Sequence, residues 1–194
     1  TFASPDGRAS LANAVTEVVV EDNAFVDRYK LQLEGAESLH VATLAARLSR
    51  DARFSDHSIS FGAALSRNDI EVRFEAEGGE CVLNGLFVVD GRRVADTHST
   101  VDHAKPHCSS RELYKGVLDG QARGVFNGLV VVRPGAQKTD AGQINRTLLL
   151  SREALVHSTP QLELLADDVK CKHGSTTGQP DPSAPFHLRS RGIG

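Results

Sequence analysis

The chain has 194 residues, a formal net charge of −3, and 40% hydrophobic and 24% charged residues. This length is enough to bury a core in one domain. Phosphate-binding domains carry a basic surplus or stripe, so the charge gives no reason to expect nucleic acid as a partner. No apolar run approaches the roughly 18 residues of a membrane-spanning helix, and no basic-then-apolar signal segment opens the sequence.

Two residue types are absent: the sequence has no Met and no Trp. Thr1 is therefore not expected to be a native translation start, and we expect a processed product or a piece of a longer protein. The core must rest on Val, Leu, Ile, Ala and Phe. Three widely spaced cysteines, Cys81, Cys108 and Cys171, argue against a disulfide-stapled secreted fold and favour a reducing compartment. Cytosol or an organelle stroma is the expected location.

The elements read mostly as strands. Residues 1–14 are small and polar and are expected to form a loose lead-in. Strand patterns follow: a β-branched run over 18–20, alternation of apolar and polar residues over 29–33, and strict period-two alternation over 69–76. Only residues 39–48 could form a short helix by propensity. Elsewhere Gly and Asn-Gly interrupt every candidate helix longer than two turns.

The sequence also resembles itself. Residues 82–91, VLNGLFVVDG, recur as residues 125–135, VFNGLVVVRPG, with the Asn-Gly pairs 43 residues apart. A short Ser-Arg motif recurs with its serines separated by 17, 44 and 41 residues. These intervals favour a unit of about 20 residues, the size of a solenoid coil, with Gly and Asn-Gly at corners that need positive φ. A β-sandwich, and chance similarity among Val-rich strands, are the alternatives.

The densest polar cluster lies in residues 98–108 and holds three histidines, an aspartate and a cysteine. Its spacing matches no zinc finger, because it has no Cys-x-x-Cys and no His pair behind one. A metal-dependent hydrolase or lyase could still use His98, Asp102, His103 and His107; the alternative is a strand and corner with solvent-facing histidines. No phosphate-binding loop, nucleophile elbow or His-Glu-x-x-His motif occurs, so ATP hydrolysis by this chain alone is not expected.

A second cluster, residues 167–176, contains Cys171 and His173. On a strand these two residues share a face, and Lys170 and Lys172 point the other way. A thiol beside an imidazole could form a thiolate–imidazolium pair, or offer two ligands to iron or zinc. Two ligands do not complete a tetrahedral site, so a metal would need ligands from a partner chain. The alternative is a small core cysteine with a hydrogen-bonded histidine beside it.

Several runs in the second half of the chain are similar to a known family. They are VDHAKPHCSSRELYKG at 101–116, ARGVFNG at 122–128, VVRP at 131–134, AQKTDAGQ at 136–143, LLLS at 148–151, PQLE at 160–163, ADDVKCKHG at 166–174 and LRSRGI at 188–193. They resemble the SufB/SufD family of iron–sulfur cluster assembly proteins, most closely its SufD side. The runs cover about half the chain, and the first hundred residues match only in style. In this reading His103, His107 and Cys108 belong to the fold's pattern.

The resemblance implies an all-β fold, a right-handed parallel β-helix, and a scaffold rather than an enzyme. In the family, SufB, SufD and the ATPase SufC form a complex, and SufB and SufD pair through the C-terminal parts of their β-helices. A transient iron–sulfur cluster is thought to form at that junction on a SufB cysteine and a SufD histidine. That histidine lies in a Lys-Cys-x-His-Gly motif, residues 170–174 here. His173 is therefore the expected cluster-assembly residue and a shared metal ligand, with Cys171 the weaker candidate. No catalytic residue is expected, and no cofactor in the isolated chain.

The resemblance also sets the expected domains: a lead-in over 1–14, a β-helix core over 15–178, and an irregular or helical tail over 179–194 before an absent helical domain. That domain docks SufC in the family, so this chain alone is not expected to recruit the ATPase well. A SufB-like subunit is the expected partner. Without it we expect a homodimer or a larger assembly, because exposed strand edges commonly find a partner. Lys172 replaces a small polar residue, and three prolines in 179–185 weaken the expectation of a helix.

Overall fold

The computed structural model describes residues 1–4, 8–179 and 191, and within these it contains thirteen strands and no helix. Accordingly, no helix in the described residues is long and apolar enough to cross a membrane. The strands are β1 Phe2–Ala3, β2 Leu11–Val20, β3 Phe25–Leu33, β4 Leu39–Leu48, β5 Arg53–Ser60, β6 Leu65–Phe74, β7 Glu80–Val89, β8 Val94–His103, β9 Ser109–Leu118, β10 Arg123–Val132, β11 Asp140–Leu149, β12 Leu155–Leu164 and β13 Lys170–Gly178.

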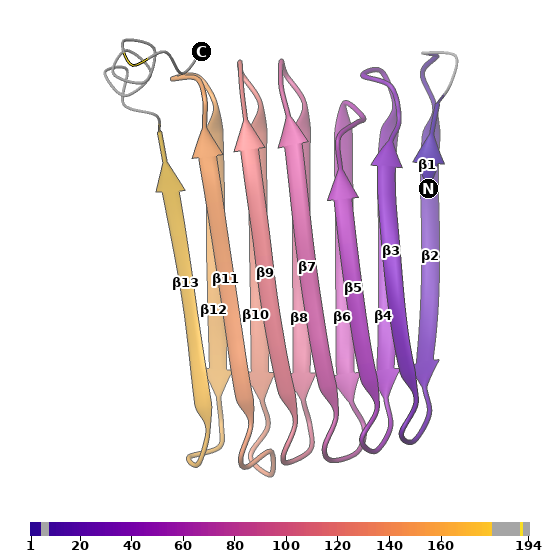
Figure 1. The fold of residues 1–194 in the computed structure, drawn as a ribbon, viewed down its shortest axis with the longest axis vertical. Coiled ribbons are helices and arrows are strands. Elements are labelled where there is room, and N and C mark those ends of the chain that lie inside the picture. Colours follow the sequence, from indigo (N-terminus) through magenta and orange to yellow (C-terminus); the bar gives the residue numbers. More distant parts are fainter. Residues whose placement is uncertain (5–7, 180–190, 192–194) are drawn as a thin grey trace.

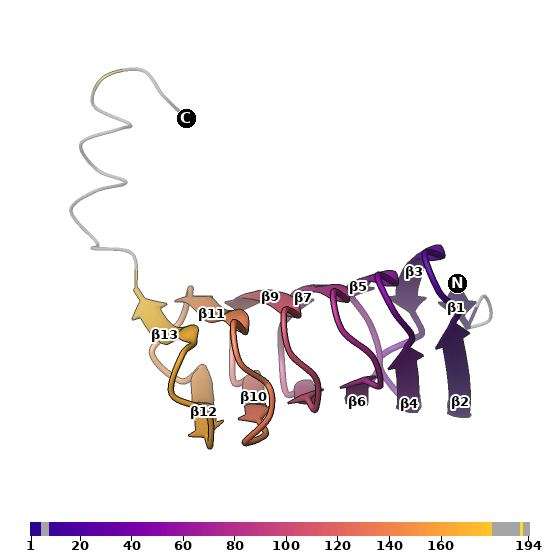
Figure 2. The ribbon, with the colours of Figure 1, turned by 90° about the horizontal axis from the view of Figure 1, so that it is seen from below.

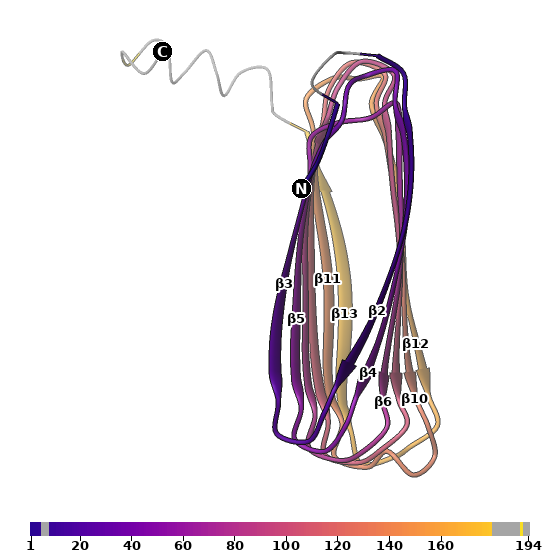
Figure 3. The same cartoon turned by 90° about the vertical axis from the view of Figure 1, so that its right-hand side faces the viewer.

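The strands form two parallel sheets. Odd-numbered strands make one sheet in the order β1-β3-β5-β7-β9-β11-β13, and even-numbered strands make the other in the order β12-β10-β8-β6-β4-β2. Figure 1 shows one sheet in front of the other, and Figure 3 shows the two layers joined by turns at both ends. The chain therefore winds as a parallel β-helix of about six turns. The solenoid prediction is confirmed, and the sandwich alternative is wrong because all pairing is parallel.

Each coil is longer than the sequence repeat predicted. Leu39 pairs with Leu65 on the next coil, and Arg123 pairs with Leu155, so one full coil separates the two members of each pair. Such a coil holds one strand from each sheet, as with β6 and β7, and two turns as well. The short repeat unit predicted from the sequence is therefore wrong. The intervals between the similar segments do not correspond to whole numbers of coils.

The two Asn-Gly pairs lie inside strands rather than at corners. Asn84-Gly85 lies in β7 and Asn127-Gly128 in β10, so their similarity relates strands of opposite sheets. Their glycines make room for large inward side chains. A Cβ at Gly85 would lie 2.2 Å from the Tyr114 ring, and one at Gly128 would lie 2.2 Å from Gln143 Nε2. The expected corner role of Asn-Gly is therefore wrong.

One corner of successive coils carries a residue with positive φ. Its backbone N–H donates to a carbonyl of the next coil, at N···O distances of 2.7 to 3.4 Å. Asn, Asp and His tolerate this left-handed conformation better than most residues, and Gly adopts it freely. The corner residues are Asn23, Asp51, Gly78, His107 and Lys138.

The predicted strands are largely confirmed. The alternation over 69–76 overlaps the second half of β6, which ends at Phe74, and Ile70, Val72 and Phe74 are buried there. The candidate helix over 39–48 is instead β4, because pairing with β2 and β6 outweighs helix propensity.

The N-terminal segment that was expected to be loose contains strands. The first residues include β1, which pairs with β3, and β2 already begins at Leu11, within the segment expected to be loose. Most of the expected tail over 179–194 lies outside the described residues.

The interior of the helix is only partly apolar. Phe54, Phe74, Leu83 and Phe126 are fully buried, as the composition required. Polar side chains are buried as well, and they fall into columns because matched positions on successive parallel strands lie about 4.8 Å apart. The buried polar residues in the coils that lead to the C-terminal end include Ser99, Glu112, Gln143 and Asn145.

Candidate functional site

The C-terminal end of the solenoid is formed by β12 and β13, each an edge strand of its sheet. Figures 1 and 2 show these strands at one end of the row of coils. In the preceding strand β11 the inward residues are buried, whereas in β12 and β13 they are half-buried or exposed. Inward side chains of this terminal coil are thus accessible without any movement of the core.

Cys171 and His173 lie on the same inward face of β13. Cys171 is the strand partner of Ala141 and His173 is the partner of Gln143, and both partners are buried in the lumen. The Cys171 side chain packs against the main apolar cluster, and its burial raises the pKa of the thiol. A protonated thiol opposes the thiolate–imidazolium pair that the spacing suggested, so Cys171 contributes chiefly to packing here.

The His173 imidazole reaches across the lumen to the other sheet. Its Nδ1 lies 3.0 Å from the carbonyl oxygen of Pro160 on β12. A carbonyl oxygen only accepts hydrogen bonds, so Nδ1 must carry the hydrogen, and Nε2 of the neutral ring then holds a free lone pair. Metal-binding histidines commonly donate their other N–H to a backbone carbonyl, which fixes tautomer and ring orientation. The exposed His173 thus has the arrangement of a single, incomplete metal ligand.

Beneath His173 lies a buried hydrogen-bonded group that the sequence did not reveal as a unit. Glu112 Oε1 accepts a hydrogen bond from Gln143 Nε2 at 3.1 Å, and Glu112 Oε2 accepts one from the Ser99 hydroxyl at 2.6 Å. Glu112 is 2% exposed. Its burial raises the pKa of the carboxyl to about 7, although both hydrogen bonds act in the opposite direction. The three residues come from three different strands, so only the register of the strands brings them together, and no single sequence motif contains them.

The histidines of residues 98–108 do not converge. His103 points into the lumen, where its Nε2 lies 2.9 Å from Ser110 Oγ, and burial lowers its pKa to about 4. His98 belongs to the outer face, 3.0 Å from Asp96. His107 holds a corner. No group of three or more His, Cys, Asp or Glu in the described part of the chain could hold a metal ion. The ligand cluster of the alternative hydrolase or lyase is therefore not assembled in the described residues.

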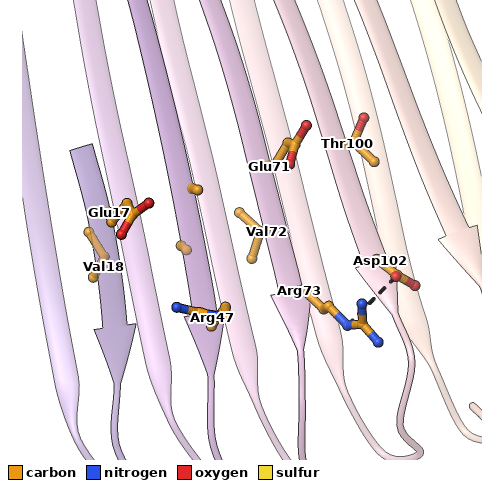
Figure 4. Close-up of a pocket in the computed structure, with 10 residues that line it drawn as sticks. Glu17, Val18, Arg47, Glu71, Val72, Arg73, Thr100 and Asp102 are labelled. Atoms are coloured by element: carbon orange, nitrogen blue, oxygen red, sulfur yellow. Dashed lines mark ion pairs between the residues drawn. The ribbon is translucent and has the colours of Figure 1, made fainter. Parts of the chain in front are cut away.

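Asp102, the fourth of those candidate ligands, lines a groove on the outer face of the even-numbered sheet. The groove has a volume of about 430 Å³ and is lined by charges of both signs. Figure 4 shows Arg73 directed toward Asp102, and the two lie 4.0 Å apart, while Arg133 contacts the same carboxylate at 3.0 Å. Ion pairs of this kind occupy Asp102 and leave it unsuited to a metal.

Comparisons with known proteins agree with the fold and the motif. The family model described as the SufBD core domain of the SUF system for iron–sulfur cluster assembly matches residues 1–194. The chain is 37% identical to the iron–sulfur cluster assembly protein SufD of Escherichia coli over 192 residues, which are 99% of this chain and 45% of that protein. It is 36% identical to a SufBD family protein of Synechocystis sp. over 189 residues, or 97% of this chain and 42% of the relative. A chloroplastic protein of Arabidopsis thaliana is 34% identical over 93% of this chain.

These matches extend the resemblance. The expectation that the first hundred residues match only in style is wrong, because the family model and these relatives cover almost the whole chain. The chain spans less than half the length of the curated relatives from Synechocystis and Escherichia coli.

Proposed function

The chain belongs to the SufBD family of iron–sulfur cluster assembly proteins, and we propose that it acts as the SufD-like half of a shared assembly site. In this proposal His173 presents Nε2 to a nascent iron–sulfur cluster at a junction with a SufB-like subunit. The cluster is cargo that leaves the site, and the remaining ligands come from the partner. The protein is a scaffold rather than an enzyme, and ATP hydrolysis belongs to SufC.

The observation that carries the proposal is the hydrogen bond from His173 Nδ1 to the Pro160 carbonyl at 3.0 Å. It frees Nε2 on the accessible terminal coil and fixes the direction of the ring. Within the described residues, the adjoining strands β12 and β13 are the edges of the two sheets, and edge strands present backbone groups for pairing. A partner that extends these sheets would bring its own side chains next to His173 and complete the coordination.

The remaining parts of the proposal follow from the family. SufC would dock on a helical domain outside this chain. Without a SufB-like partner, the same strand edges would support a homodimer. The bacterial and chloroplastic relatives fit a cytoplasmic or plastid-stromal setting. Cys171, whose thiol has a raised pKa through burial, is the weaker ligand and supports the position of β13.

Replacing His173 with Ala in the full-length protein should abolish cluster assembly by the reconstituted complex and leave the complex itself intact. The imidazole is the group that would bind the cluster. Because the His173 side chain is exposed, its removal should leave the core unchanged. Cluster loading by iron and sulfide analysis, together with the mass of the complex in solution, measures both effects.

The matched control is His157→Ala. His157 lies on β12 of the same terminal coil and is also exposed, but alternation places it on the outer face. It should leave cluster loading unchanged. Equal loading by the wild type and the His173→Ala variant would instead favour a purely structural subunit that pairs with SufB without offering a ligand.

A further inference from the structure

We propose that Glu112 and Gln143 are positioning residues for His173: together with Ser99 they form a column of side chains through the lumen that holds the imidazole against Pro160. This inference deepens the proposed function and rests on it. It assigns a role to two buried polar residues that lie outside the Lys-Cys-x-His-Gly motif.

The register of the odd-numbered sheet aligns the three residues. Glu112 on β9 is the strand partner of Gln143 on β11, and Gln143 is the partner of His173 on β13. Their side chains therefore follow one another through three successive coils, about 4.8 Å apart. The register thus places Gln143 one coil before His173 and Glu112 one coil before Gln143.

The even-numbered sheet supplies a matching column. Ser99 on β8 partners Gly128 on β10, and Gly128 partners Pro160 on β12. The two columns meet in the first and last of these coils, because Ser99 donates to Glu112 at 2.6 Å and His173 lies 3.0 Å from the Pro160 oxygen.

In the middle coil a glycine replaces a hydrogen-bonding partner. A Cβ on Gly128 would lie 2.2 Å from Gln143 Nε2 and 2.6 Å from its Cδ. The absence of a side chain there lets the Gln143 amide extend across the lumen to the opposite sheet. A hydrogen bond thus crosses the lumen in the first and last of these coils, and in the middle coil the Gln143 amide lies close to Gly128.

The fold itself does not require polar residues in this column. Leu83 on β7 is the strand partner of Glu112 in the preceding coil and is fully buried. An aliphatic side chain therefore fits the same position of the lumen. A buried carboxyl and amide are costly to desolvate. One further buried carboxyl, Asp56 on β5, lies in this column one coil before Leu83, and Glu112 and Gln143 occupy the two coils directly before His173.

The hydrogen bond to Glu112 also fixes the orientation of the Gln143 amide. Gln143 Nε2 is committed to the carboxylate, and Gln143 Oε1 is buried with no hydrogen-bond partner in the described residues. Turning the amide over would place its oxygen against the Glu112 carboxylate, which only accepts hydrogen bonds. Glu112 thus holds Gln143 in one orientation, and Gln143 provides a fixed floor for the His173 ring.

The test compares three variants of the full-length protein with the wild type. They are the double variant Glu112→Leu/Gln143→Leu, the single variant Gln143→Leu, and the conservative variant Glu112→Gln. Removing both members of the Glu112–Gln143 hydrogen bond together leaves only the Ser99 hydroxyl without its acceptor, so the double variant should fold and form the complex. It should lower the rate of cluster assembly about 10-fold or more, as loss of residues that orient a ligand does. Glu112→Gln keeps an acceptor for Gln143, so its rate of cluster assembly should stay within about twofold of the wild-type rate.

A second readout separates positioning from the ligand role of His173. In the full-length protein labelled with ¹⁵N-histidine, the His173 ring should carry its hydrogen on Nδ1 in the wild type and in Glu112→Gln. It should exchange between both tautomers in the double variant and in Gln143→Leu. This measurement needs no cluster, so it tests the column even if His173→Ala were to leave assembly unchanged.

An unchanged tautomer in the double variant would overturn the proposal. So would an unchanged assembly rate together with a changed tautomer, because the column would then have no bearing on the site. If the double variant fails to fold, Gln143→Asn serves instead, since its shorter side chain should lose the hydrogen bond to Glu112. It should show the same tautomer exchange, and a wild-type tautomer there would equally contradict the proposal.

Discussion

The Glu112→Gln variant should become more stable than the wild type as the pH rises. Burial raises the pKa of Glu112 from 4.5 to about 7. Between these values the native carboxyl holds a proton that the unfolded chain has lost, so stability falls with rising pH. Above the native pKa the full cost is present, about 3 kcal/mol. Gln is neutral at every pH and escapes this cost.

Urea unfolding of the 194-residue chain measures the effect. The difference in unfolding free energy between the variant and the wild type should shift by about 2–3 kcal/mol in favour of the variant between about pH 5 and pH 8. Glu80 on β7 has an exposed side chain, and Glu80→Gln should shift by less than about 0.5 kcal/mol. A parallel pH dependence of Glu112→Gln and wild type would show that Glu112 titrates as in water.

The Phe126→Ala substitution should destabilise the chain by about 3–5 kcal/mol, the usual cost of removing a fully buried ring. Phe126 on β10 is 0% exposed, and its ring centre lies 4.8 Å from that of Tyr114 on β9. These two rings join the sheets in the coils just below the terminal coil. Removal of the Phe126 ring leaves a cavity beside Tyr114, whose own ring fits only because Gly85 has no side chain.

The control for this loss lies on the same strand. Leu129 alternates to the outer face of β10 and is half-buried, so Leu129→Ala should cost clearly less than Phe126→Ala in the same urea experiment. Similar costs for the two variants would mean that the lumen relaxes around the missing ring and that the aromatic pair does not hold the sheets together.

The sequence predicts strand patterns well where the inward face is apolar. In β6 the alternation of charged residues with Ile70, Val72 and Phe74 identifies both the strand and its buried face. β11 shows the limit of this reasoning, because Gln143 and Asn145 are buried while Leu148 is 40% exposed. Apolar residues occur on both faces of this strand, since Leu149 is buried, so an apolar-inward reading does not identify the buried face.

The size of the coil was predicted wrongly for a related reason. The Asn-Gly pairs are alike because Gly85 and Gly128 both face bulky side chains in the lumen, not because they occupy the same place in a repeat. The similarity of these two segments therefore reflects the packing of a large side chain against a glycine, and it does not reflect the length of the structural repeat. The corner that does repeat is occupied in five coils by five different residue types, Asn, Asp, Gly, His and Lys. It therefore produces no recognisable sequence motif.

The candidate site divides in the same way. The Lys-Cys-x-His-Gly motif singles out His173, and period-two alternation places Cys171 on its face. The partners that fix the imidazole, Pro160 and Gln143, come from other strands. Their positions depend on the register of β13 against β11 and on the distance across the lumen to β12, which only the folded chain reveals.

The central claim is that His173 Nε2 binds the nascent cluster, and pulsed electron paramagnetic resonance tests it most directly. The complex would be assembled with ¹⁵N-histidine in this subunit alone, and the cluster would be reduced to a paramagnetic state. We predict a ¹⁵N hyperfine coupling to the cluster in the wild type and in His157→Ala, whereas His173→Ala should load no cluster. A loaded, paramagnetic cluster with no histidine coupling from this subunit would contradict the account.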